Sequence, residues 1–95
     1  MKFRKKTIVI EAIQYLGDEN FNEVREFIDS TVPLHRMGDQ KLGLPTLEGV
    51  HIVSSGDWII RGIKAEYYAC KPDVFVATYD PVPEGEPASK WRYES

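Results

Sequence analysis

The segment from Ser55 to Tyr79 constrains the fold most strongly, because turn, strand and helix signals follow one another within it. Ser55-Gly56-Asp57 is typical of a turn, since glycine accepts positive φ and the Ser and Asp side chains can bond nearby backbone groups. The β-branched and aromatic run 58–61 follows, and residues 62–65 have the length of a hairpin loop before the aromatic run 66–70. We therefore predict two antiparallel strands at 58–61 and 66–70.

Side-chain alternation in these two strands predicts one core face and one partly wet face. Trp58 and Ile60 share a face opposite Ile59 and Arg61. On the return strand, the residues of one face are Glu66, Tyr68 and Cys70, and those of the other face are Tyr67 and Ala69. Trp58 is predicted to lie in the core.

A short helix is predicted over 72–79. Pro72 suits the first helical position, Asp73 complements the exposed N–H groups of the first turn, and Asp80-Pro81 ends the helix. The side predicted to dock on the sheet consists of Val74, Phe75, Thr78 and Tyr79.

Length and composition favour an ordinary small domain. With 95 residues, a net charge of −3 and 42% hydrophobic residues, we expect one α+β domain over 1–80 and a flexible tail over 81–95. We expect a cytoplasmic protein with no membrane contact, because no run approaches about 18 apolar residues and no secretory signal stands at the start. The lone cysteine, Cys70, excludes an internal disulfide, and we interpret it as a buried inert thiol.

The first residues form a basic cluster. It consists of Lys2, Arg4, Lys5 and Lys6. Such a cluster can contact nucleic acid, but we favour a solvated strand entrance that discourages edge pairing.

Two elements are predicted before the central loop. The segment 7–15 is apolar on both sides, which is typical of a strand covered on both faces. Asn20 is a predicted N-cap with Glu23 in the capping-box position for a helix over 21–29. Its apolar stripe consists of Phe21, Val24, Phe27 and Ile28.

The region 30–54 is less regular. A short edge strand is predicted near 32–36, and another strand runs from Leu42 through 46–48. Gly49 is then a turn or bulge before a return strand in which Val50 and Ile52 face inward and His51 faces outward.

The fold prediction is thus a small α+β domain. It has a mainly antiparallel sheet of about five strands, one amphipathic helix and a short second helix near the C-terminus. In the polar tail, Trp91 and Tyr93 either pack back onto the domain or contact a partner. A homo-oligomer is compatible with this predicted fold.

The catalytic candidates lack a recognisable pattern. They are His35, His51, Cys70, Glu48, Asp57 and Glu66. The histidine spacing does not match a zinc motif, and glycine loops that bind phosphate are missing, so we expect no metal and no cofactor. Paired carboxylates remain the basis of an enzyme hypothesis with Glu48, Asp57 or Glu66.

The preferred location for a small ligand is the hairpin. Cations near the helix start, with aromatic rings that stack on flat groups, suggest a weak site for a nucleotide-like anion. Its predicted residues are Arg61, Lys64, Tyr68 and Lys71. Solvated charges and core aromatics would give the same pattern.

Several motifs together resemble a family of small, uncharacterised proteins encoded by tailed phages and prophages. The matching segments are 2–6, 9–14, 46–49, 56–62, 66–68, 70–73, Phe75 and 78–79. Members usually carry proline at the position of Ser55 and glycine at that of Ala65, and both differences fall in turns. The resemblance implies a phage accessory protein in a bacterial cytoplasm and transfers no catalytic residue.

Three functions are compatible with these features. We favour a non-enzymatic module that binds a host protein and redirects or blocks it. The alternatives are a protein that sequesters a nucleotide-like anion and a small enzyme that uses carboxylates.

Overall fold

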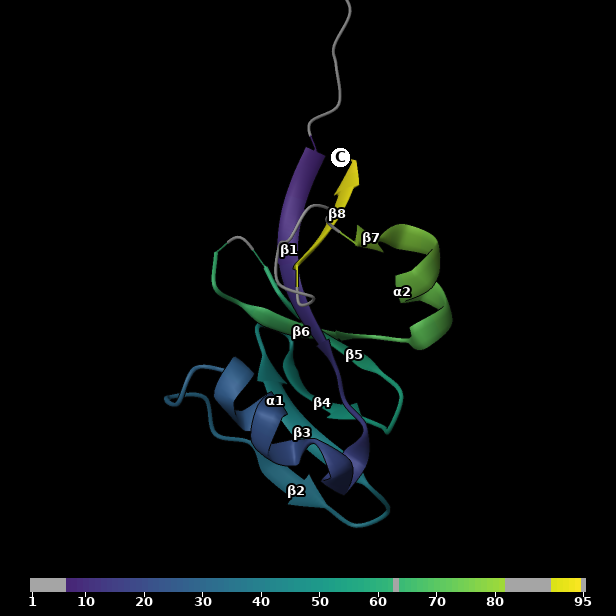
Figure 1. The fold of residues 1–95 in the computed structure, drawn as a ribbon. Helices are drawn as coiled ribbons and strands as arrows, with labels where there is room; N and C mark the ends of the chain where they lie inside the picture. Colours follow the sequence, from purple (N-terminus) through teal and green to yellow (C-terminus); the bar gives the residue numbers. More distant parts are fainter. Residues whose placement is uncertain (1–6, 63, 82–89, 95) are drawn as a thin grey trace, which may run out of the picture.

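The computed structural model describes residues 7–62, 64–81 and 90–94 (Figure 1). The basic cluster at 2–6 and the tail residues 82–89 lie outside this part of the chain. The elements in order are β1 (Thr7–Gln14), η1 (Gly17–Glu19), α1 (Phe21–Phe27), β2 (His35–Met37), β3 (Lys41–Thr46), β4 (Gly49–Val53), β5 (Trp58–Arg61), β6 (Tyr67–Cys70), α2 (Pro72–Thr78), β7 (Asp80–Pro81) and β8 (Lys90–Glu94).

The strands form two antiparallel sheets. The larger sheet has the order β6-β5-β1-β8-β7, and the smaller sheet has the order β2-β3-β4. In Figure 1 the smaller sheet and α1 occupy the lower part of the molecule, and α2 lies beside the upper part of the larger sheet. The predicted combination of antiparallel strands with two helices is confirmed. The expected single sheet is wrong, because β2–β4 form a sheet of their own.

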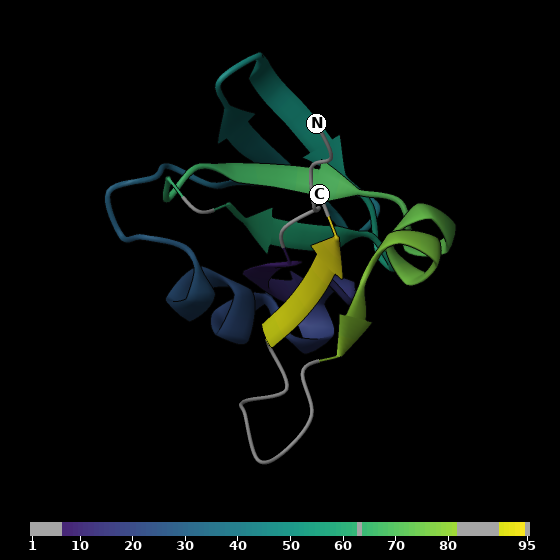
Figure 2. The ribbon, with the colours of Figure 1, turned by 90° about the horizontal axis from the view of Figure 1, so that it is seen from above.

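Both faces of the larger sheet are covered, and this follows from alternation along its strands. Ile10, Ala12 and Ile60 share one core cluster with Phe75 of α2. On the other face, Ile59 and Tyr67 belong to a second cluster with residues of α1 and the smaller sheet. The predicted assignment of side chains to opposite faces of 58–61 and 66–70 is therefore confirmed. The predicted partly wet face is wrong, because α1 and the smaller sheet cover it. Helices α1 and α2 lie on different sides of the molecule (Figure 2).

Helix α1 packs with the predicted stripe. Val24 is 0% exposed and Ile28 is 2% exposed, while Phe21 and Phe27 are partly buried against the same cluster. The predicted cap is wrong, because the Asn20 side chain makes no capping bond to α1. Its Oδ1 instead accepts from the Leu16 N–H (2.8 Å) and its Nδ2 donates to the Gln14 carbonyl (2.7 Å), which fixes the chain leaving β1.

Helix α2 begins at Pro72 as predicted, but it buries fewer side chains than the predicted docking side contains. Phe75 is fully buried and stacks on the Trp58 ring, with ring centroids 4.0 Å apart and an interplanar angle of 2°. The Tyr79 ring also contacts Phe75, with ring centroids 4.9 Å apart and an interplanar angle of 32°. Val74 and Thr78 are exposed, so the prediction that they dock on the sheet is wrong. A seven-residue helix presents few side chains to the sheet, and Phe75 is the one fully buried in the cluster with Ile10 and Ile60.

Strand β4 has the opposite orientation to the predicted one. Val50 is 60% exposed and Ile52 is 47% exposed, whereas His51 is partly buried. Val53 is fully buried in the core cluster shared with α1. Because side chains alternate, burial of Val53 places His51 on the inner face and Val50 and Ile52 on the outer face.

The C-terminal part returns to the larger sheet. Lys90–Glu94 forms β8, which pairs antiparallel with both β1 and β7. This differs from the flexible tail predicted for 81–95. Pairing between β1 and β8 joins residues far apart in sequence, so local composition carried no signal for it.

Two turns have backbone geometries that favour proline at position 55 and glycine at position 65. The Asp57 N–H donates to the Ser54 carbonyl (2.9 Å) and Gly56 has φ 101°, which is the geometry of a type II turn with Ser55 in the position that favours proline. Ala65 has φ 61°, in the left-handed region that favours glycine.

Ser55→Pro combined with Ala65→Gly is therefore expected to raise the free energy of unfolding by about 1–2 kcal/mol. Urea unfolding followed by circular dichroism measures this change. Ala77→Gly within α2 is the control and should instead lower stability by about 0.5–1 kcal/mol. A double variant less stable than the parent chain would contradict the turn assignments.

Candidate functional site

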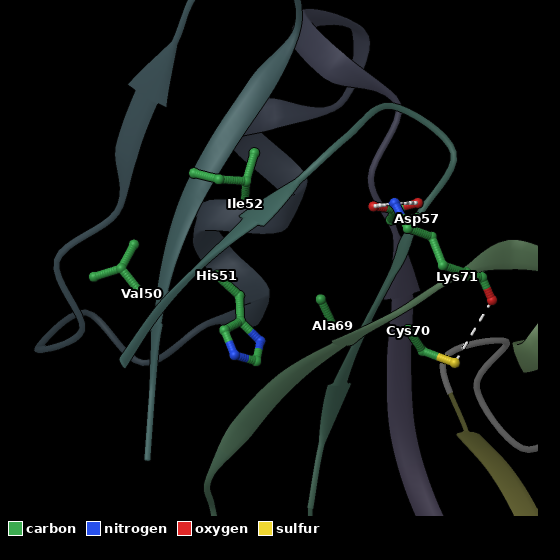
Figure 3. A pocket seen from close by; sticks show the side chains of 7 residues that line it. All are labelled: Val50, His51, Ile52, Asp57, Ala69, Cys70 and Lys71. Atoms are coloured by element: carbon green, nitrogen blue, oxygen red, sulfur yellow. Dashed lines mark hydrogen bonds and ion pairs between the residues drawn. The ribbon is translucent and has the colours of Figure 1, made fainter. Parts of the chain in front are cut away.

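A groove lies between β4 of the smaller sheet and β6 of the larger sheet. It consists of two adjoining hollows that share His51. The first, the Lys71 hollow, has a volume of about 360 Å³ and is lined by Val50, His51, Ile52, Asp57, Ala69, Cys70 and Lys71 (Figure 3). The second, the Glu66 hollow, has a volume of about 230 Å³ and is lined by Thr46, Leu47, Glu48, His51, Glu66, Tyr67 and Tyr68. We call the two hollows together the β4–β6 groove.

The two strands run in the same direction along the groove. The hairpin at Leu47 and Glu48 lies at the Glu66 hollow, and β4 then proceeds to Ile52 at the Lys71 hollow. Likewise β6 leads from Tyr67 at the Glu66 hollow to Lys71 at the other. Within the described ranges, each strand is paired on one side only, β4 with β3 and β6 with β5, and no backbone hydrogen bond joins them. Both walls are therefore strand edges.

The backbone of β4 is directed into this open side at two residues. Pro45 pairs with Val50, and because proline has no N–H, we assign this pair to the non-hydrogen-bonded positions of the ladder. Alternation then places the Gly43–Ile52 pair in the same class. The N–H and C=O groups of Val50 and Ile52 thus point away from β3, toward the groove that both residues line.

The side chains of β4 divide between its two faces. Figure 3 shows the His51 ring on the side of Ala69, while the Val50 and Ile52 side chains project from the opposite face of the strand. The free edge of β4 therefore presents backbone groups flanked by apolar side chains on one face and by His51 on the other.

A buried carboxylate closes one end of the groove. The Asp57 side chain is 6% exposed, and its Oδ2 accepts from the Ser54 N–H (3.0 Å) and from Lys71 Nζ (3.1 Å). The Lys71 side chain is 66% exposed, so this ion pair reaches solvent and contributes little by attraction alone. Its main effect is to hold Lys71 at the end of the groove.

Cys70 lies in the same hollow but is poorly activated. Burial raises the pKa of the Cys70 thiol, and the Asp57 and Asp73 carboxylates raise this pKa further. The thiol donates to the Lys71 carbonyl at 3.6 Å. A raised pKa keeps the group protonated at neutral pH, and the thiolate is the nucleophile, so the groove does not support thiol catalysis.

The four predicted ligand residues do not converge. Tyr68 lines the Glu66 hollow and Lys71 lines the other hollow of the groove, whereas exposed Lys64 lines neither. Arg61 lines a separate hollow beside the end of α1, together with Glu26 and Asp29, and lies 3.9 Å from Glu11.

The β5–β6 register explains this separation. Arg61 pairs with Tyr67 at one end of the hairpin, and Trp58 pairs with Cys70 at the other end. Three residues of strand place the two ends about 10 Å apart. Arg61 and Lys71 therefore do not form a joint anion site, and each already faces a carboxylate.

The three carboxylates of the enzyme hypothesis are distributed over the two hollows of the groove. Glu48 and Glu66 line one hollow together with His51, while Asp57 is engaged by Lys71 in the other. His35 is exposed on β2, where it pairs with Gly43 in the opposite half of the smaller sheet. Sequence reasoning missed the edge of β4, because pairing of β4 on one side only depends on the arrangement of the two sheets.

Comparison with known proteins gives no match, since no family model, no curated protein and no solved structure matches the chain. In the part of the chain that the structure describes, no helix is long and apolar enough to cross a membrane.

Proposed function

We propose that the protein is a non-enzymatic binding module that receives an extended segment of a partner protein at the free edge of β4. The observation that carries this proposal is the outward direction of the Val50 and Ile52 backbone groups into an open groove. Unpaired strand edges bind extended peptides by main-chain hydrogen bonds, and neighbouring pockets select their side chains.

The apolar side chains beside this edge support the same proposal. Val50 and Ile52 are 60% and 47% exposed, and Leu47 at the hairpin is 89% exposed. Clustered apolar side chains on one face of an edge strand are typical of an interaction surface. Alternate side chains of an added strand would cover Val50 and Ile52, while those between them would enter the groove.

The resemblance of several sequence motifs to those of a phage family supports a setting for this activity. We place the protein among phage or prophage accessory proteins that act in a bacterial cytoplasm, with a host protein as the partner. The sequestration alternative receives less support, because Arg61 and Lys71 lie at opposite ends of the hairpin and face carboxylates.

Photo-crosslinking from both walls of the groove tests this proposal. A benzophenone side chain is placed at Val50 on β4 or at Ala69 on β6, and the tagged protein is irradiated in a bacterial host lysate. We expect both positions to capture the same host protein through the same segment of its chain. Val76 on α2, which is 74% exposed, is the control position and should not capture it. Equal capture from Val76, or capture from neither wall, would contradict the proposal.

A further inference from the structure

We propose that the Glu66 hollow binds a basic side chain, Lys or Arg, carried by the segment that adds to β4. This inference rests on the proposed function and names the chemistry of the partner. It starts from Glu66, whose Oε2 is buried without a hydrogen-bond partner. A carboxylate oxygen removed from water without a donor is costly, and a cationic donor entering the hollow would compensate its charge.

The backbone beside the hollow holds Glu66 in this position. The Gly62 N–H donates to the Glu66 carbonyl (2.8 Å), and the Ala65 N–H donates to the Gly62 carbonyl (3.0 Å). A Cβ at position 62 would lie 2.8 Å from Glu66 Cδ and 3.3 Å from Tyr68 Cε1. Only glycine therefore lets the carboxylate pack here, and the turn that holds it contains Ala65 at φ 61°. Strained backbone of this kind is concentrated at binding sites.

The remaining lining suits an alkyl chain that ends in a cation. Glu48 supplies a second carboxylate and Tyr68 supplies an aromatic ring, whereas the Tyr67 ring is buried against Phe27. Leu47 at the rim offers an apolar contact for a methylene stem. A Lys or Arg head group can pair with carboxylates and with ring faces at the same time.

Strand geometry also predicts the sequence around this basic residue. In a strand added to β4, the residues on either side of the basic one would point to the opposite face, beside Val50 and Ile52. Those neighbours should be apolar. The partner segment is therefore expected to alternate apolar, basic and apolar residues.

Titration with butylguanidinium, followed by amide chemical shifts, tests the hollow without any partner. We expect saturable shifts at Thr46, Glu66 and Tyr68, and none with butylurea, its neutral counterpart of similar shape. Glu66→Gln preserves the shape and should weaken binding about tenfold. Glu23→Gln, an exposed carboxylate on α1, is the matched control and should leave the affinity unchanged.

Equal binding of butylurea, or unchanged affinity in Glu66→Gln, would overturn the inference. Such a result, obtained while both groove walls still crosslink one host segment, leaves the proposed function standing. Conversely, butylguanidinium binding without any crosslink would establish the cation site and remove the proposed function.

Discussion

Phe75→Ala is expected to lower the free energy of unfolding by about 3–5 kcal/mol. Phe75 is fully buried, contacts the rings of Trp58 and Tyr79, and is the residue by which α2 joins the core of the larger sheet. A helix of seven residues is too short to persist in water on its own, so it depends on this contact. Urea unfolding followed by far-ultraviolet circular dichroism gives the difference.

Val76→Ala is the matched control for this prediction. Val76 is the next residue of the same helix and is 74% exposed, so its truncation should change stability by less than about 0.5 kcal/mol. A loss below about 1 kcal/mol for Phe75→Ala would show that α2 is not anchored through this ring.

Local signals predicted the β5–β6 hairpin and the start of α2 correctly. The turn at Gly56 and the proline at position 72 act through backbone geometry that their own residues impose. The stripe of α1 was also predictable, because a 3.6-residue period identifies a buried face without knowledge of the partner.

The face of β4 could not be decided locally. Val50, Ile52 and Val53 are all apolar, so alternation permits either Val50 and Ile52 or Val53 to face the core. Packing against α1 and β3 settled the choice in favour of Val53. In α2, similarly, contact with Trp58 selected Phe75, and Val74 remained exposed.

Long-range pairing was the least predictable feature. Strand β8 joins β1 across most of the chain, and the separation of β2–β4 into their own sheet depends on which edges meet. Pairing between strands that are far apart in the chain produces no periodic pattern in the sequence. This is why a flexible tail and a single sheet were predicted instead.

The candidate site depends on the same long-range geometry. Arg61, Lys64 and Lys71 are close in sequence but are distributed along a hairpin, which separates them. Glu48, His51 and Glu66 come from two sheets and meet only because β4 lies beside β6. Whether a strand is an edge is a property of the whole fold, and no residue of β4 encodes it alone.

Ile52→Pro tests the central claim most directly, because it removes a backbone N–H from the free edge of β4. Proline is tolerated on an edge strand where the missing N–H is not part of the ladder. We therefore expect the variant to stay folded. The Kd of the variant for the host protein captured by crosslinking should rise by about 5–150-fold, since one partner carbonyl loses its donor.

Ile52→Val is the control, since it keeps the N–H, the β-branched shape and the apolar character at the same position. It should retain most of the affinity, and Val50→Pro should reproduce the loss at the second outward-facing residue. If folded Ile52→Pro and Val50→Pro both bind the host protein as tightly as the parent chain, the partner does not add to the edge of β4.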